Sequence, residues 1–330
     1  MKLVSFGSQG NETPGVLIGG ERIVPLIDPM RSWGFAVTDM NDVLRHLPEL
    51  QPRIEDLVAT GKNAVPLASA RLGPPVPRPG AIFAVGANYR SHLAELAESE
   101  LPSKPILFAK TAASLTGPYD AIQIPAETTT LDYEIELAVV IGRTARRIAV
   151  DTALEHVAGY MVANDVTARD VFLGESQKNP MYLQTLRGKG YDTFCPTGPW
   201  LVTRDEVNDV GKLRLQLSVN NDLRQDDTCG SMIFDAPAVV ASVSEFVTLQ
   251  PGDIILTGTP SGVGFTRQPP EFLTAGDTVE LEITGLGVMR TPVINEPSVS
   301  APATARLASA TSGRQRLQGG PQVDRRHRGR

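Results

Sequence analysis

The stretch LDYEIELAVVI at residues 131–141 is the part of the chain from which the fold can be argued. Its first seven residues alternate, so in a strand Asp132, Glu134 and Glu136 would share one face and the apolar residues the other. The apolar run at 138–141 indicates that the strand enters the core. Neighbouring carboxylates there would repel each other and lose hydration unless a cation lies between them. An edge strand with a solvated acidic face is the alternative, and the pattern alone leaves both open.

A third acidic candidate follows another apolar run. Asp165 stands after the apolar residues 159–163, where it could cap a helix or bind a metal. Together with Glu134 and Glu136 it would form an oxygen-only site, with no cysteine or histidine nearby. Such a site suits Mg²⁺ or Mn²⁺, and also Ca²⁺, better than zinc.

Two further segments carry side chains suited to proton transfer and anion stabilisation. His92 and Glu95 lie three residues apart in a helix predicted over 91–99, so they share a helix face. They could form a base with its orienting carboxylate, or an ordinary surface salt bridge. Lys189 lies between two glycines and could stabilise an oxyanion, although a flexible surface loop explains the same pattern.

A strand followed by a loop of small residues is predicted over 252–264, GDIILTGTPSGVG. Gly258, Gly262 and Gly264 would let a carboxylate ligand approach backbone N–H groups, unless they only form a tight turn. The loop lacks both the GK[ST] element of a phosphate-binding loop and the GxGxxG pattern of a dinucleotide site. We therefore expect no nucleotide cofactor.

Composition and charge narrow the class of protein. Hydrophobic residues make up 41% and charged residues 21% of the 330 residues, as in a soluble globular protein. Without a long apolar run or a signal-like start, we expect a cytoplasmic protein that does not span a membrane. Cys195 and Cys229 lack metal-binding spacing and fit a reducing compartment. The net charge of -6 combines about -12 for residues 1–297 with +6 for residues 298–330, so nucleic acid is not an expected partner of the main domain.

The chain divides into four predicted regions. Residues 1–72 form a small domain of short strands and a helix over 39–59 that Pro48 and Pro52 interrupt. Residues 73–80 form a stiff Pro-rich linker, and residues 81–297 form a β-rich domain with few helices. Residues 298–330 have few bulky apolar side chains and are predicted to be a disordered, Arg-rich tail.

Separate blocks of the sequence, in this order, resemble the fumarylacetoacetate hydrolase family over about residues 79–292. They are VGANYRSHLAEL, LDYEIELAVVIG, GYMVANDVTARD, RGKGYDTFCPTGPW, VNNDLRQDDTCGSMIF and GDIILTGTPSGVG. Within the family, the chain resembles the acylpyruvase and 2-hydroxyhepta-2,4-diene-1,7-dioate isomerase branch, which has a small N-terminal α/β domain. The resemblance implies an α+β, β-rich fold with a rolled mixed β-sheet. It also implies a homodimer, which the apolar segment 231–234 favours as well.

The resemblance also implies roles for individual residues. It makes Glu134, Glu136 and Asp165 the ligands of Mg²⁺ or Mn²⁺, and His92 with Glu95 the water-activating dyad. Lys189 would point at the substrate on the metal. The substrate-binding positions would be Arg224, Gln225, Gly258 and Thr259.

The implied reaction is metal-dependent hydrolysis of a carbon–carbon bond in a small 2,4-dioxo, acylpyruvate-type acid, through an enolate. One alternative is an isomerase, decarboxylase or hydratase of a 2-oxo or 2-hydroxymuconate-type dicarboxylate in aromatic catabolism. An alternative of another class is a non-catalytic binding protein whose tail recruits a partner. The intact set of acidic, dyad and lysine residues argues against the last of these.

Overall fold

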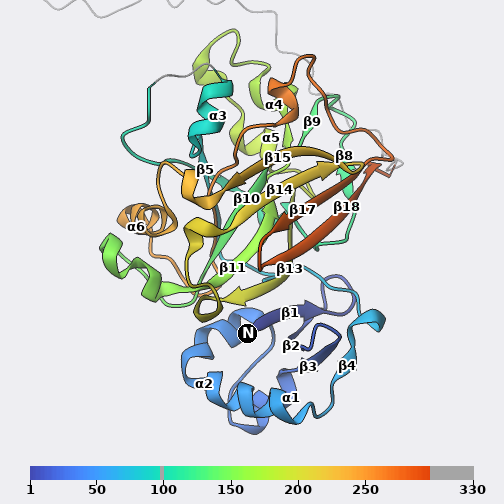
Figure 1. Cartoon of the computed structure of the whole chain (residues 1–330), viewed down its shortest axis with the longest axis vertical. Coiled ribbons are helices and arrows are strands. Elements are labelled where there is room, and N and C mark those ends of the chain that lie inside the picture. Colours follow the sequence, from blue (N-terminus) through green and yellow to red (C-terminus); the bar gives the residue numbers. More distant parts are fainter. Residues whose placement is uncertain (97–99, 298–330) are drawn as a thin grey trace, which may run out of the picture. The chain divides into compact units, whose positions relative to one another are not determined.

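The computed structural model describes residues 1–96 and 100–297. Within them, two large sheets carry most of the strands (Figure 1). One sheet has 11 strands in the order β4-β3-β2-β1-β13-β11-β10-β16-β5-β6, with β7 pairing with β13, and the other has five in the order β15-β14-β17-β18-β8. The strand-rich α+β class predicted from the sequence is confirmed.

The strands of the large sheet are β1 (Lys2–Phe6), β2 (Thr13–Ile18), β3 (Arg22–Pro25), β4 (Val65–Pro66), β5 (Ile82–Gly86), β6 (Ile106–Lys110), β7 (Leu115–Thr116), β10 (Ile135–Ile141), β11 (Val157–Asn164), β13 (Cys195–Thr203) and β16 (Ile254–Leu256). The five-stranded sheet contains β8 (Ile122–Ile124), β14 (Arg214–Val219), β15 (Asp222–Thr228), β17 (Thr278–Ile283) and β18 (Gly287–Asn295). Two short strands, β9 (Leu131–Asp132) and β12 (Thr167–Ala168), pair with each other.

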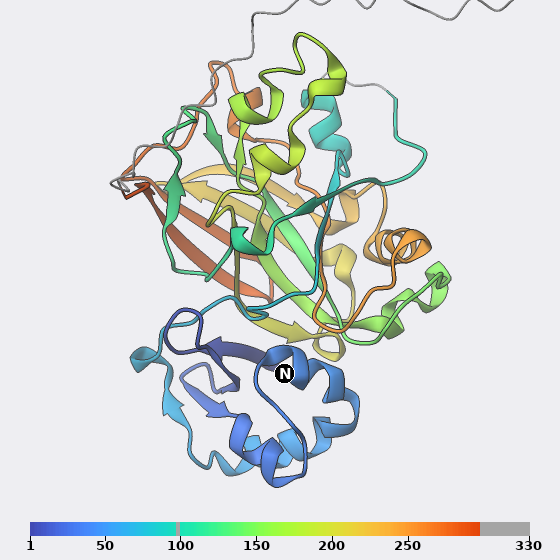
Figure 2. The same ribbon diagram turned by 180° about the vertical axis from the view of Figure 1, so that it is seen from behind.

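The α-helices are α1 (Ile27–Ser32), α2 (Met40–Thr60), α3 (Arg90–Glu95), α4 (Arg169–Leu173), α5 (Thr185–Lys189) and α6 (Ala236–Phe246). A 3₁₀ helix at Val150–His156 precedes β11. Figures 1 and 2 show α3, α4 and α5 close together at one end of the sheets.

Strand β10 lies in the middle of the large sheet, between β11 and β16. Its odd-numbered residues, such as Leu137 and Val139, pack into the core shared with the five-stranded sheet. Its even-numbered residues Ala138 and Val140 pack into a second core, which includes α2. The edge-strand alternative for this segment is therefore wrong, and Glu136 is buried.

Pro48 and Pro52 were predicted to interrupt the helix, but α2 continues through both of them. Pro48 and Pro52 lie on its exposed face. Asp39 caps the helix by accepting hydrogen bonds from Asn41 N and Asp42 N. The buried face, with Leu44 and Leu50 fully covered, holds the helix together.

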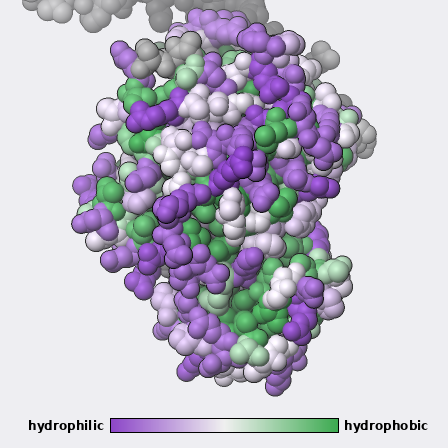
Figure 3. Space-filling model, viewed as in Figure 1, coloured by the Kyte–Doolittle hydropathy of each residue, from purple (hydrophilic) through white to green (hydrophobic). Residues whose placement is uncertain are grey.

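The strands of the first segment extend the large sheet, because β1 pairs with β13 at Lys2↔Val202 and Leu3↔Leu201. A small hydrophobic cluster that includes Val4 and Ile23 packs there against partly buried hydrophobic side chains. Figure 3 shows hydrophobic residues, in green, exposed together on the surface of this segment. The division into an N-terminal domain, a linker over 73–80 and a catalytic domain stays a prediction.

Two predictions fall partly outside the described residues: the tail at 298–330, and the end of the helix over 91–99, of which α3 covers Arg90–Glu95. Among the described residues, no helix is long and apolar enough to cross a membrane.

Candidate active site

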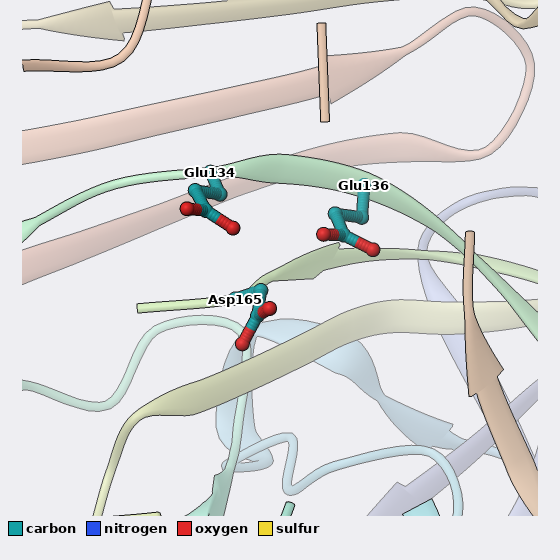
Figure 4. A group of neighbouring side chains, drawn as sticks. All are labelled: Glu134, Glu136 and Asp165. Atoms are coloured by element: carbon teal, nitrogen blue, oxygen red, sulfur yellow. The ribbon is translucent and has the colours of Figure 1, made fainter. Parts of the chain in front are cut away.

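Three buried carboxylates converge in one place. Glu136 belongs to β10, Glu134 directly precedes that strand, and Asp165 directly follows β11. Figure 4 shows their carboxylates turned toward a common space. One oxygen from each lies within 4.8 Å of the others. Asp165 forms no helix cap: it precedes β12, and its side chain accepts hydrogen bonds from lysines.

The strand predicted over 131–137 is interrupted between β9 and β10, and two side chains take over its backbone hydrogen bonds. Glu134 N donates to Asn164 Oδ1 at 2.9 Å, and Ile135 N donates to Gln225 Oε1 at 3.0 Å. The interruption separates Asp132 from the other two acids. Asp132 instead accepts hydrogen bonds from Gly264 N, Phe265 N and Arg169.

Three buried cations surround these acids. Lys189 Nζ donates to Asp165 Oδ2 at 2.6 Å and to Glu134 Oε2 at 2.9 Å, and it also donates to the hydroxyl of Thr167. Lys110 Nζ donates to Asp165 Oδ1 at 2.6 Å. Arg169 bridges Asp132 and Glu134. Lys189 is therefore the buried last residue of α5, and the flexible-loop alternative is wrong.

Glu136 differs from its neighbours because it forms no ion pair within the described part of the chain. It accepts a hydrogen bond from Gly258 N at 2.6 Å. Burial raises the pKa of Glu136 well above its usual range, and the carboxylates of Asp165 and Glu134 raise it further. For Glu134, burial alone would raise the pKa, but the charges of Lys189 and Arg169 lower it to about 2.

These residues fit a divalent metal ion. Asp132, Glu134, Glu136 and Asp165 are four buried acids, against the three cations Lys110, Arg169 and Lys189. A divalent cation among the triad would supply the charge that Glu136 lacks, and would leave a site attractive to an organic anion. The oxygen-only set suits Mg²⁺ or Mn²⁺.

His92 and Glu95 form a hydrogen-bonded pair beside the acids. Because Glu95 accepts at Oε1, His92 Nδ1 donates across 2.6 Å and leaves Nε2 as a proton acceptor. Glu95 Oε2 also accepts hydrogen bonds from Gly262 N and Thr266 Oγ1. His92 is 9% exposed, so the surface salt-bridge alternative is wrong. Ser91 Oγ donates to Asp227 Oδ2, and α3 begins at Arg90.

The glycine loop after β16 (Ile254–Leu256) binds carboxylates of the protein itself. The backbone N–H groups of Gly258, Gly262 and Gly264 donate to Glu136, Glu95 and Asp132, respectively. Gly258 has φ +93°, and a Cβ there would lie 2.8 Å from Asn88 Cβ. The loop therefore positions the site acids, whereas the sequence suggested that these amides receive a ligand carboxylate.

Only some of the predicted substrate-binding residues lie at the cavity. Thr259 lines the same cavity as Glu134 and Glu136. Gln225 is buried and donates to Thr259 Oγ1 and to Pro260 O, so its amide is used within the protein. Arg224 does not line that cavity; it pairs with Glu271 and Asp222. A direct substrate contact by Gln225 or Arg224 is not supported.

One cavity of about 320 Å³ brings the remaining residues together. His92, Glu134, Glu136, Arg169, Lys189 and Thr259 line it, and most of its other lining side chains are apolar. A concave, mostly apolar space with a few polar groups is typical of a small-molecule site.

Sequence reasoning missed several residues that hold the site. Lys110 ends an apolar strand and Arg169 follows Asp165 by four residues, but a single basic residue at such a place carries little signal. Asn164 and Thr266 act on backbone or side-chain groups that are distant in sequence. Their partners become visible only when the chain is folded.

Fold and site together define a family of enzymes. Residues 81–294 match the family model described as fumarylacetoacetate (FAA) hydrolase C-terminal, and the chain belongs to this family. It is 40% identical over 308 residues to a mitochondrial oxaloacetate tautomerase of Xenopus laevis, covering 89% of this chain and 90% of the relative.

Two solved structures are similar over the whole of their chains. A probable 2-hydroxyhepta-2,4-diene-1,7-dioate isomerase from Mycobacterium abscessus has 41% identity and a TM-score of 0.74, with 90% of this chain and 100% of that chain covered. Maleylpyruvate hydrolase from Sphingobium sp. SYK-6, in complex with manganese(II) and pyruvate, has 32% identity, a TM-score of 0.73 and the same coverage.

Proposed function

We propose that the protein is a metal-dependent hydrolase of a small 2,4-dioxo acid, cleaving the bond between C3 and C4. The observation that carries this proposal is that His92, held by Glu95, lines the same cavity as Glu134, Glu136 and Lys189. The manganese and pyruvate in the maleylpyruvate hydrolase complex support it, since pyruvate is one product of such cleavage.

Glu134, Glu136 and Asp165 would hold the metal ion. If bound there, Mg²⁺ or Mn²⁺ would supply a Lewis acid that stabilises negative charge developing on the substrate. Ca²⁺ fits the same oxygen ligands. The proposal needs no nucleotide.

His92 would act as the general base. Its Nε2 takes a proton from water, and the water oxygen attacks the distal C4 carbonyl while Glu95 stabilises the charged imidazole. The C3–C4 bond then breaks, its electron pair forms the enolate of pyruvate, and C4 leaves as a carboxylic acid. C3 takes up a proton to complete the reaction.

Lys189 would stabilise the enolate oxygen. In the structure its ammonium group donates to two carboxylates and one hydroxyl. Glu134 and Asp165 are also proposed metal ligands, so their oxygens would be shared with the ion. This sharing would release N–H donors of Lys189 for the substrate.

A second candidate function is keto–enol tautomerisation of a 2-oxo acid. Its support is the 40% identity to an oxaloacetate tautomerase over most of both chains. The same residues suit this reaction: His92 would move a proton at C3, and Lys189 would stabilise the enolate. No attacking water is needed.

The test is a substrate screen with Mg²⁺ or Mn²⁺. Acetylpyruvate, benzoylpyruvate, oxaloacetate and 2-hydroxymuconate-type diacids are assayed by the change in enol absorbance, with chromatographic analysis of the products. Pyruvate and a carboxylic acid from a 2,4-dioxo acid are expected. Metal-dependent absorbance change without cleavage would favour the tautomerase, and no turnover of any compound would contradict both.

A further inference from the structure

We infer that the outer part of the cavity binds an apolar acyl group and discriminates against a substrate that ends in a second carboxylate. This inference rests on the proposed function, in which the 2-oxo acid end of the substrate lies at the acidic triad. It adds the chemical nature of the other end of the substrate.

The outer walls of the cavity are apolar. They are formed by Leu96 at the end of α3, Phe172 and Leu173 of α4, Leu183 before α5, and Ile106 at the start of β6. Figures 1 and 2 show α3, α4 and α5 at the same end of the sheets. Ile106 and Leu183 are 53% and 44% exposed, so an apolar substituent would remove water from them.

The cations that line the cavity are both engaged at its inner end. Arg169 binds Asp132 and Glu134, and its guanidinium lies 5.7 Å from the ring centre of Phe265. Lys189 donates to Glu134, Asp165 and Thr167, and its ammonium lies 5.2 Å from the ring centre of Phe108. The donors that metal binding would release are those proposed for the enolate oxygen, which is also at the inner end. In the described residues that line the cavity, no cation remains for a distal carboxylate.

A terminal carboxylate in the outer part would therefore lose hydration without gaining an ion pair, which is unfavourable. An aliphatic or aromatic acyl group would bury apolar area on both sides of the contact. Oxaloacetate would not meet this cost, because its second carboxylate is bonded to C3 and stays near the inner end.

The first test measures binding without turnover. Calorimetry on the Mn²⁺-loaded protein compares 2-oxo-4-phenylbutanoate with 2-oxoadipate, which share the 2-oxo acid end and differ at the distal end. We expect the phenyl compound to bind at least ~10-fold more tightly. Equal binding, or preference for the diacid, would overturn the inference even if the protein hydrolyses acylpyruvates.

The second test adds a cation to the outer wall. Leu183→Arg places a guanidinium at a partly exposed wall position, so folding should be retained. The ratio of kcat/KM for benzoylpyruvate to that for succinylpyruvate should fall by ~10-fold or more. Leu186→Arg is the matched control: it is in α5, 57% exposed and outside the cavity lining, so its ratio should equal that of the parent.

The outcomes separate the two proposals. If neither acylpyruvate is cleaved, the proposed hydrolysis fails, and the ratio of the two dissociation constants in the parent and in Leu183→Arg still tests the distal preference. If both are cleaved equally well by the parent, hydrolysis stands and the apolar preference is wrong.

Discussion

Glu136 is the residue whose environment most directly indicates a cation-binding site. Its neighbours Glu134 and Asp165 each pair with lysine or arginine, whereas Glu136 accepts only the Gly258 amide in the described residues. A buried carboxylate without a counter-charge is strongly destabilised. The sequence pattern indicated that neighbouring carboxylates would need a cation if their strand were buried. Because β10 is buried, Glu136 has this energetic cost.

Glu136→Gln should sharply weaken divalent-metal binding, because it keeps the shape but removes a full charge. Calorimetric titration of the metal-free protein with Mn²⁺ measures the change. Glu245→Gln, at an exposed position on α6, is the matched control and should bind Mn²⁺ like the parent. Undiminished affinity in Glu136→Gln would remove Glu136 from the ligand set.

The metal-free protein should lose the stability contributed by Glu136 as pH rises. The pKa of Glu136 is raised in the folded state above the ordinary value of 4.5, so its contribution is complete below pH 4.5 and disappears as pH rises through the folded-state pKa. Urea unfolding in EDTA between pH 5 and pH 8 should show a steeper fall for the parent than for Glu136→Gln. Identical slopes would contradict the assigned pKa direction.

At the scale of elements, the interruption between β9 and β10 decides the geometry of the site. A regular strand over 131–137 would put Asp132, Glu134 and Glu136 on one face. The structure instead uses the side chains of Asn164 and Gln225 to satisfy backbone groups at the interruption. Gln225 also links this point to the loop containing Thr259.

Gln225→Ala should therefore destabilise the protein by about 1–3 kcal/mol, because it leaves buried polar groups, including Ile135 N, without partners. Denaturant unfolding measures this free energy. The control is Gln216→Ala on the adjacent β14, where the half-buried side chain should matter by about 0.5 kcal/mol or less. Equal effects of the two changes would show that the link is not structurally important.

Elements with strong local patterns were predictable, and those that depend on distant partners were not. The apolar runs that became β10 and β11, and the strand before the glycine loop that became β16, were found from the sequence pattern. The prediction that prolines interrupt α2 was wrong, because tertiary burial of the apolar face of the helix outweighs the two lost hydrogen bonds. The triad and dyad residues were identifiable from blocks of sequence, whereas Lys110 and Thr266 act through long-range contacts.

At the scale of the whole molecule, family membership fixes the architecture but leaves the reaction open. The related proteins carry the names of a tautomerase, an isomerase and a hydrolase on one fold. The chemistry must therefore be argued from the site.

We predict a homodimer, as the resemblance implied. The apolar segment 231–234 gives this less support than its sequence suggested, because Ile233 N and Phe234 N both donate to Asn88 and Met232 is only 8% exposed. Light scattering at micromolar concentration should give twice the mass of the chain. A monomer under those conditions would be evidence against the assembly, while leaving the site assignment intact.

We propose that His92, oriented by Glu95, activates water beside a metal held by the acidic triad. Hydrolysis of benzoylpyruvate with saturating Mn²⁺ by the parent and by His92→Ala tests it most directly, with folding and Mn²⁺ binding checked separately. His46→Ala is the matched control, since His46 makes the same three-residue pairing with Glu49 on the surface of α2. We predict a loss of roughly 100-fold to 10,000-fold in kcat for His92→Ala, with folding and metal affinity retained and no loss for His46→Ala. Hydrolysis by His92→Ala at close to the parent rate would contradict the account.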